Sequence, residues 1–194
     1  MAHQTDAGRL YQSIAEEVFS QEQYMQSKAR KSALEIPELA LVHLLWRRLV
    51  KDQGEIFQSS EVRSSWESSF EGTARVDLMF EVAHGGTTSA ALIEFKIRDT
   101  ETGYVRDLDK LAQNASRAPN SRRFFCALVD EFPDKAHLSG RIKTVQEWVC
   151  PNNQYKAVSV ASPGNFRQFP TKIPDFARPL ECIVGMWEVV RGDA

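Results

Sequence analysis

Two stretches of alternating polarity, 74–83 and 90–98, constrain this chain more than any other feature. Along each stretch every second residue is apolar and most residues between them are polar, which is the period of a β-strand with two different faces. The segment between the two stretches contains Gly85-Gly86, which is typical of a hairpin turn. The two stretches are therefore predicted to pair as an antiparallel β-hairpin.

The apolar residues of this hairpin indicate how its strands meet. A turn that pairs Ala83 with Ala90 places Leu78 opposite Phe95, and the other apolar residues of the two strands also meet one another. A slip of one residue would place each of them against a polar residue. The expected register therefore pairs Ala83 with Ala90.

The polar face of the hairpin carries three charged residues. In the expected register Asp77 lies beside Lys96, with Glu94 one step along the same face. Taken singly, such residues are more often a solvated sheet face with charge pairing. The strands around them are apolar enough to be buried on both sides, and buried converging charges need a ligand to offset their desolvation. A divalent cation with oxygen ligands suits two carboxylates.

The remaining periodicity predicts helices before the hairpin and alternating helices and strands after it. A first helix follows Asp6 and fades in the polar run 21–31, and a second begins near Pro37 and ends at Gly54. Residues 55–62 are predicted as a short strand, and 64–72 as a connection anchored by Trp66 and Phe70. The later elements are a helix at 104–118, a strand at 122–129, a helix at about 134–149, a strand at 155–160, a Pro-rich loop at 163–179 and a final strand at 180–190. This order predicts an α/β sandwich with a mixed sheet.

Length and composition set the broad class. With 194 residues, 42% hydrophobic and 26% charged, the chain is expected to form one globular domain. We expect an N-terminal helical decoration at about 1–34, a core at about 35–160 and a C-terminal extension at about 161–194. The three cysteines form no CxxC pair, which argues against a disulfide framework or a zinc site. No signal peptide or membrane span is apparent, so a soluble cytoplasmic protein is expected.

Asp77 followed by Glu94-Phe95-Lys96 resembles the bipartite motif of the PD-(D/E)xK nuclease superfamily, with Arg-Val in place of a proline before the aspartate. The predicted order of elements over about residues 35–130 is also similar to that superfamily's α-β-β-β-α-β core. The resemblance implies a restriction-endonuclease-like fold, in which a mixed central sheet is flanked by helices.

The resemblance also implies roles for individual residues. Asp77 and Glu94, joined by the backbone carbonyl of Phe95, would bind Mg²⁺ or Mn²⁺, and Lys96 would orient or deprotonate the attacking water and neutralise charge on the phosphate. Members often add an acidic residue from the helix before the sheet. Glu38 is the candidate here and Glu35 the next, although an acid in the first turn of a helix also favours the helix dipole without any catalytic role.

The helix that follows the motif carries a polar face of Arg106, Lys110 and Gln113 at helical spacing. These side chains are candidates for contact with nucleic-acid phosphates, and ordinary solvation is the alternative. Arg117, Arg122 and Arg123 would extend the basic surface. The formal net charge of −2 and the pI near 6.1 mean that any nucleic-acid binding must use such a local patch.

The expected function is a metal-dependent endonuclease, a hydrolase that cleaves DNA in restriction, phage defence or repair. One alternative is a nuclease that acts on RNA. Another is a non-catalytic interaction or immunity-type protein on the same fold, which the acidic balance favours and the intact Asp77, Glu94 and Lys96 oppose. Specificity would come from loops, a homodimer or a protein partner, because no separate recognition module is evident.

Overall fold

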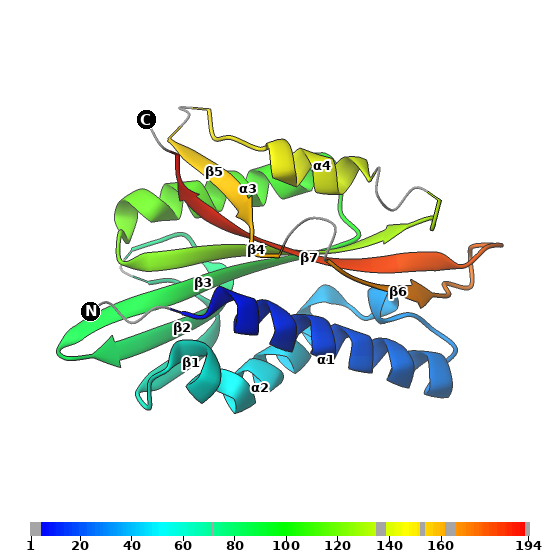
Figure 1. Ribbon diagram of the computed structural model, residues 1–194, viewed down its shortest axis with the longest axis horizontal. Coiled ribbons are helices and arrows are strands. Elements are labelled where there is room, and N and C mark those ends of the chain that lie inside the picture. Colours follow the sequence, from blue (N-terminus) through cyan, green and yellow to red (C-terminus); the bar gives the residue numbers. More distant parts are fainter. Residues whose placement is uncertain (1–4, 71, 135–138, 152–153, 162–165, 193–194) are drawn as a thin grey trace.

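A seven-stranded mixed sheet lies between two layers of helices in the computed structural model (Figure 1). The structure describes residues 5–70, 72–134, 139–151, 154–161 and 166–192. The elements are α1 (Ala7–Lys28), the 3₁₀ helix η1 (Ala33–Glu35), α2 (Glu38–Phe57), β1 (Val62–Ser68), β2 (Val76–His84), β3 (Thr87–Ile97), α3 (Glu101–Arg117), β4 (Ser121–Glu131), α4 (Gly140–Glu147), β5 (Tyr155–Ser159), β6 (Arg167–Thr171) and β7 (Leu180–Arg191). The predicted α/β class with a mixed sheet is confirmed.

The strand order is β1-β2-β3-β4-β7-β5, with β6 paired to β7. β3 and β4 are parallel and the other pairs are antiparallel. The parallel pair is connected through α3, which crosses one face of the sheet (Figure 1). β7 lies in the interior between β4 and β5, so residues beyond 161 contribute an inner strand of the sheet.

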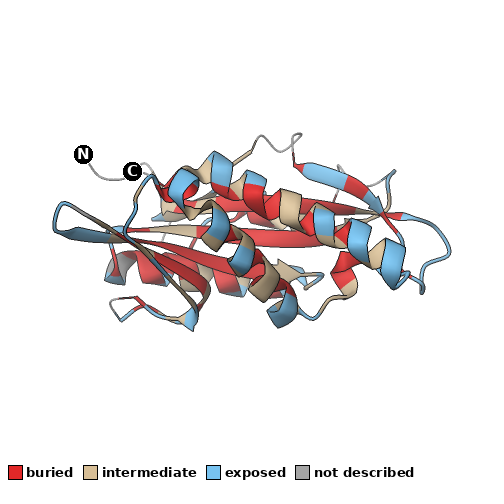
Figure 2. Cartoon of the chain, turned by 90° about the horizontal axis from the view of Figure 1, so that it is seen from below, coloured by how far each residue is buried: buried red, intermediate tan, exposed pale blue. Residues whose placement is uncertain are grey.

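Two apolar clusters cover the two faces of the sheet. α1 and α2 pack on one face, where the ring of Phe57 stacks on that of Phe80 with centroids 4.9 Å apart. α3 and α4 pack on the other face, where the ring of Tyr104 meets that of Phe125 edge to face. Buried residues run along the sheet beneath the helices (Figure 2). A charged side chain in the middle of this sheet is therefore desolvated unless it reaches an open edge.

The hairpin forms, but its predicted register is wrong by two residues. Leu78 pairs with Ile93 and Ala83 with Thr88, instead of with Phe95 and Ala90. The strands continue to a tight turn at Gly85 and Gly86, whose φ angles of 54° and 82° suit a two-residue turn of the kind that hairpins favour. A shift of two residues leaves every side chain on its predicted face, because the period of a strand is two.

The segment before the hairpin departs further from prediction. Residues 55–62 are not a strand: α2 continues past Gly54 to Phe57, because Ile56 and Phe57 are fully buried in its last turn. β1 instead occupies 62–68, so it begins at the last residue of the predicted strand and lies mostly in the predicted connection 64–72. Phe70 is buried as expected, whereas Trp66 is 46% exposed, with its ring centroid 5.7 Å from that of His43 on α2.

Three further elements differ in extent. α1 does not fade at 21 but reaches Lys28, because Glu22 is buried and its carboxylate accepts hydrogen bonds from the Ser32 hydroxyl and the Ala33 amide. The predicted loop 163–179 contains β6, a short strand that includes Pro170. α4 is described only from Gly140 to Glu147, and residues 135–138 of the predicted helix lie outside the described residues. The final strand is confirmed as β7.

None of the described helices is both long enough and apolar enough to cross a membrane.

Candidate active site

The charged residues of the hairpin meet where β2 begins and β3 ends. Asp77 is the second residue of β2. Glu94 and Lys96 lie among the last four residues of β3, and their side chains are on the face that α3 covers. The Phe95 amide donates a hydrogen bond to Asp77 Oδ2 at 2.7 Å. Because the backbone pairing of the two strands ends at Leu78 and Ile93, the aspartate side chain continues the link between them beyond that pair.

Glu94 is almost completely buried, with only 2% of its surface exposed. Lys110 of α3 places Nζ 2.5 Å from Glu94 Oε1 and is itself partly exposed. Burial and the nearby Asp77 carboxylate raise the pKa of Glu94 to about 8, although Lys110 opposes the shift. Burial also raises the pKa of Asp77. Two carboxylates are therefore held together at a position that penalises their charge.

Lys96 lies between two further carboxylates. Its Nζ is 3.5 Å from Glu38 Oε1, at the start of α2, and 3.3 Å from Asp107 Oδ2, on α3. Glu38 is fixed in turn, because its Oε2 accepts a hydrogen bond from the Ile97 amide at 3.2 Å. Burial alone would lower the pKa of Lys96, but Asp107 and Glu38 outweigh it and the pKa is raised. The ammonium is therefore kept charged and held in one place.

The cluster carries an excess of negative charge. Its four carboxylates, on Asp77, Glu94, Glu38 and Asp107, outnumber the ammonium groups of Lys96 and Lys110 and leave a formal charge of −2, before the exposed Arg106 guanidinium at 3.8 Å from Asp107 Oδ1 is counted. A divalent cation would balance this charge. Without one, the site can reduce it only by taking up a proton, which is the physical meaning of the raised pKa of Glu94.

The donors available to such a cation are few. Within the described part of the chain, no group of three or more His, Cys, Asp or Glu side chains is arranged to hold a metal ion. Asp77 and Glu94 supply two carboxylates, and the carbonyl of Phe95, the residue after Glu94, would be a third oxygen. Mg²⁺ commonly keeps several water ligands and binds through one or two carboxylates, so this donor set suits it.

Most of the residues singled out in the sequence lie in this cluster. The structure brings together Asp77, Glu94, Lys96, Glu38 and Lys110. Lys110 was expected to contact nucleic-acid phosphates, but its ammonium contacts the Glu94 carboxylate. Of the other candidates, Glu35 and Gln113 lie outside it and Arg106 lies at its exposed edge. Glu35 closes the capping box of η1 with Ser32, Arg106 is exposed and only 3.8 Å from Asp107 at its Nε, and Gln113 lines a cavity of about 310 Å³ beside Tyr155.

Sequence reasoning missed Asp107. It lies three residues before Lys110, so both side chains project from one face of α3 toward the sheet. The sequence did contain a signal. Asp107 lies next to Leu108 and four residues before Leu111, both apolar, which places its carboxylate near the buried side of the helix.

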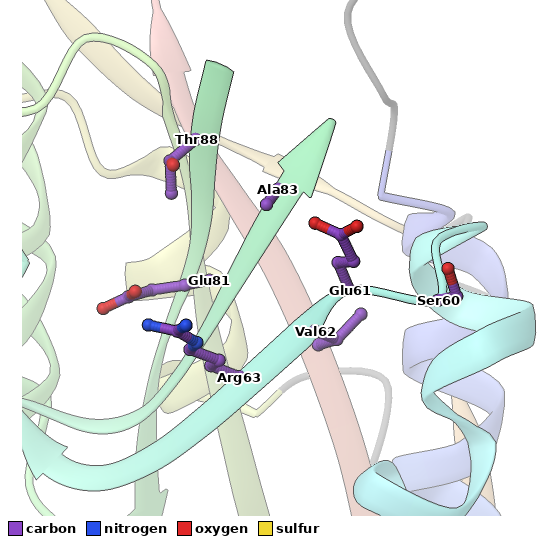
Figure 3. Close-up of a pocket in the computed structure, with 7 residues that line it drawn as sticks. All are labelled: Ser60, Glu61, Val62, Arg63, Glu81, Ala83 and Thr88. Atoms are coloured by element: carbon purple, nitrogen blue, oxygen red, sulfur yellow. The ribbon is translucent and has the colours of Figure 1, made fainter. Parts of the chain in front are cut away.

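A second hollow lies elsewhere on the hairpin, at the opposite end from Asp77. This cavity of about 460 Å³ is formed by β1, β2 and the start of β3 (Figure 3). Arg63 and Glu81 are directly paired across the two strands and project into it side by side. It contains no grouping of carboxylates with a lysine, so we place the candidate chemistry at Asp77 and Glu94.

Comparison of the chain with models of protein families, with curated proteins and with solved structures finds no match, so the chemistry proposed below rests on the geometry of this cluster.

Proposed function

We propose that this protein is a divalent-metal-dependent phosphodiesterase that cleaves nucleic acid, with DNA as the substrate. The observation that carries the proposal is the convergence of Asp77, Glu94 and Lys96 in a half-buried cluster with a formal charge of −2. Such a cluster is costly to bury, because desolvated like charges oppose folding, and a bound cation would offset that cost.

The order of elements supports a restriction-endonuclease-like core. α2, β1, β2, β3, α3 and β4 follow one another as α-β-β-β-α-β, and β1 to β4 are neighbours in the sheet. The motif residues lie on the two central strands of this unit, with one helix contributing Glu38 from one side and another contributing Asp107 and Lys110 from the other.

In this proposal Asp77, Glu94 and the carbonyl of Phe95 hold Mg²⁺ or Mn²⁺. The bound ion would lower the pKa of a coordinated water and offset charge on the scissile phosphate. Lys96 acts as a fixed positive charge beside that phosphate and not as the base, because Asp107 and Glu38 favour its protonated form. Glu38 and Asp107 position the Lys96 ammonium from two sides.

One contact favours the non-catalytic alternative. Lys110 already neutralises Glu94 at 2.5 Å, and Lys96 lies between Glu38 and Asp107, so both ammonium groups of the cluster are paired without a ligand. On that view the chain is an interaction protein, and divalent cations have no effect on it. The two functions are therefore separated by metal dependence.

The deciding experiment is incubation of the purified protein with supercoiled plasmid DNA and with single-stranded RNA, in Mg²⁺, Mn²⁺ or EDTA. We expect nicking or linearisation of the DNA in either metal and none in EDTA. Absence of cleavage of both substrates in both metals, with a protein that is folded, would favour the interaction protein. Cleavage confined to RNA would keep the chemistry and change the substrate.

Asp107→Ala is expected to lower the turnover number by roughly 10- to 100-fold and to leave KM nearly unchanged, because loss of a positioning partner typically costs that much. Asp107→Glu should recover part of the rate, since it restores a carboxylate near Lys96. The matched control is Asp109→Asn on the same helix, which keeps an oxygen for the Trp148 indole that donates to it at 3.2 Å. Equal losses in Asp107→Ala and Asp109→Asn would show that the effect is on the helix and not on Lys96.

A further inference from the structure

Rings line one surface beside the candidate site. Trp66 of β1 is 46% exposed and Leu39 of α2 is 52% exposed, although most large apolar side chains of this protein are buried. The His43 ring lies 5.7 Å from that of Trp66 and 5.5 Å from that of Trp46. The Trp46 indole donates a hydrogen bond to the Ser64 hydroxyl at 3.0 Å. These three rings, Trp46, His43 and Trp66, form a row that is fixed at one end, which we call the ring row.

The ring row lies on the opposite side of the sheet from Asp77 and is connected to the candidate site through α2 and β1. β1 is the edge strand of the sheet, and Trp66 pairs with Leu78, the residue after Asp77. Leu39 directly follows Glu38 in α2, so the exposed apolar surface begins next to a residue that contacts Lys96. Trp66 lies on the α2 side of the sheet and Asp77 on the α3 side, and Glu38 lies where the two sides meet.

Two cations share a face of α2 with Leu39 and His43. His43, Arg47 and Lys51 follow Leu39 at intervals of four residues and so share one face of α2, on which Arg47 and Lys51 are exposed. The acidic residues near the end of α2 face elsewhere, because Asp52 pairs with Arg48 and Glu55 with Arg9. The surface therefore combines flat rings with cations.

We propose that the ring row and the cations of α2 bind an unpaired stretch of a nucleic-acid strand, with bases stacked on Trp66 and His43 and phosphates beside Arg47 and Lys51. Proteins that bind single strands combine these two features, whereas the bases of an intact duplex are stacked on one another and cannot reach a ring. The proposal names the substrate class of the proposed nuclease and rests on that function for its purpose. The expected substrate is DNA with a single-stranded segment next to the scissile bond.

Binding can be measured without cleavage. We would titrate a fluorescent twelve-nucleotide oligothymidylate into the protein in Ca²⁺ and follow its anisotropy, together with the quenching of tryptophan emission. Trp66→Ala should weaken binding roughly 5- to 150-fold, the range for loss of one stacking contact, and Trp66→Phe should restore most of it. Tyr24→Ala on α1, where the ring is 59% exposed, is the matched control and should bind as the wild type does.

The cations have a separate signature. Replacement of Arg47 and Lys51 by Gln should reduce the slope of log affinity against log salt by about 1.4, or about 0.7 for each single-strand phosphate contact. A blunt duplex of twelve base pairs should bind more weakly than the single strand, and its affinity should not depend on Trp66.

Oligothymidylate affinity that is the same in the wild type and Trp66→Ala would overturn the inference, whether or not the protein cleaves DNA. Sedimentation that shows a dimer lost in Trp66→Ala, with no oligonucleotide binding, would assign the ring row to a second copy of the chain and also overturn it. Trp66-dependent binding without metal-dependent cleavage would instead retain the ring row and refute the proposed nuclease.

Discussion

Asp77→Asn is expected to reduce metal-dependent DNA cleavage by at least about 10³-fold, because a bound metal supplies several kcal/mol of transition-state stabilisation and each 1.36 kcal/mol is a factor of ten. The amide keeps the shape of the side chain and its oxygen can still accept the hydrogen bond from the Phe95 amide, so the fold should be retained. Initial rates of plasmid nicking in Mg²⁺, with thermal unfolding measured on the same samples, would check this.

The matched control is Glu81→Gln, which removes a carboxylate from the same strand and the same face but at the other end of the hairpin, beside Arg63. It should cleave within about twofold of the wild type if charge on this strand has no general effect on catalysis. Wild-type rates in Asp77→Asn would place the metal site elsewhere. Equal losses of cleavage rate in both variants would indicate a general effect on the hairpin and not a specific role of the Asp77 carboxylate.

Glu94→Gln is expected to make the metal-free protein more stable at pH 7, by about 3 kcal/mol. The pKa of Glu94 rises from 4.5 to about 8 on folding, so between these values the folded state holds a proton that the unfolded state has lost. Stability from this group is therefore complete below pH 4.5 and falls by roughly 1.4 kcal/mol per pH unit until about pH 8. Glutamine is neutral throughout and removes the penalty.

Urea unfolding of both proteins at several pH values would measure this difference. The gain should grow as pH rises from 5 to 8 and should shrink when Mg²⁺ is added to the wild type, since a ligand stabilises the state that binds it. Glu188→Gln is the control, because it loosens the contact with Arg122 at 2.6 Å and should not stabilise the protein. A gain that does not vary with pH would contradict a buried, proton-binding Glu94.

The sequence predicts the faces of the hairpin better than its register. Alternation places Asp77, Glu94 and Lys96 on one face, and a change of register by an even number of residues leaves them there. The turn was predicted to span residues 84–89, whereas the strands pair as far as His84 and Thr87, because Thr87, Thr88 and Ser89 are equally compatible with a turn and with an exposed strand end. The local pattern cannot distinguish a turn residue from a strand residue at these positions. In the structure, the positive φ angles of Gly85 and Gly86 form the two-residue turn.

Long-range packing explains the other differences. The local sequence does not show that Ile56 and Phe57 form the last turn of α2 and pack with Phe80 of β2 in the core. The β-prone segment after Gly54 is therefore predicted as a strand. The sequence also does not show which residue Lys110 contacts. The face of α3 that carries Lys110 is predictable, but the packing of α3 on β3 is what brings the Lys110 ammonium to Glu94. Asp107 acquires its contact with Lys96 in the same way.

The central claim is that Asp77 and Glu94 share a divalent cation. The most direct measurement is anomalous diffraction at the manganese edge from crystals of the protein soaked in Mn²⁺. We predict one peak between the two carboxylates, with Lys110 moved away from Glu94 Oε1, from which its Nζ lies 2.5 Å in the computed structure. No peak there, from a protein that cleaves DNA with Mn²⁺ in solution, would contradict the claim.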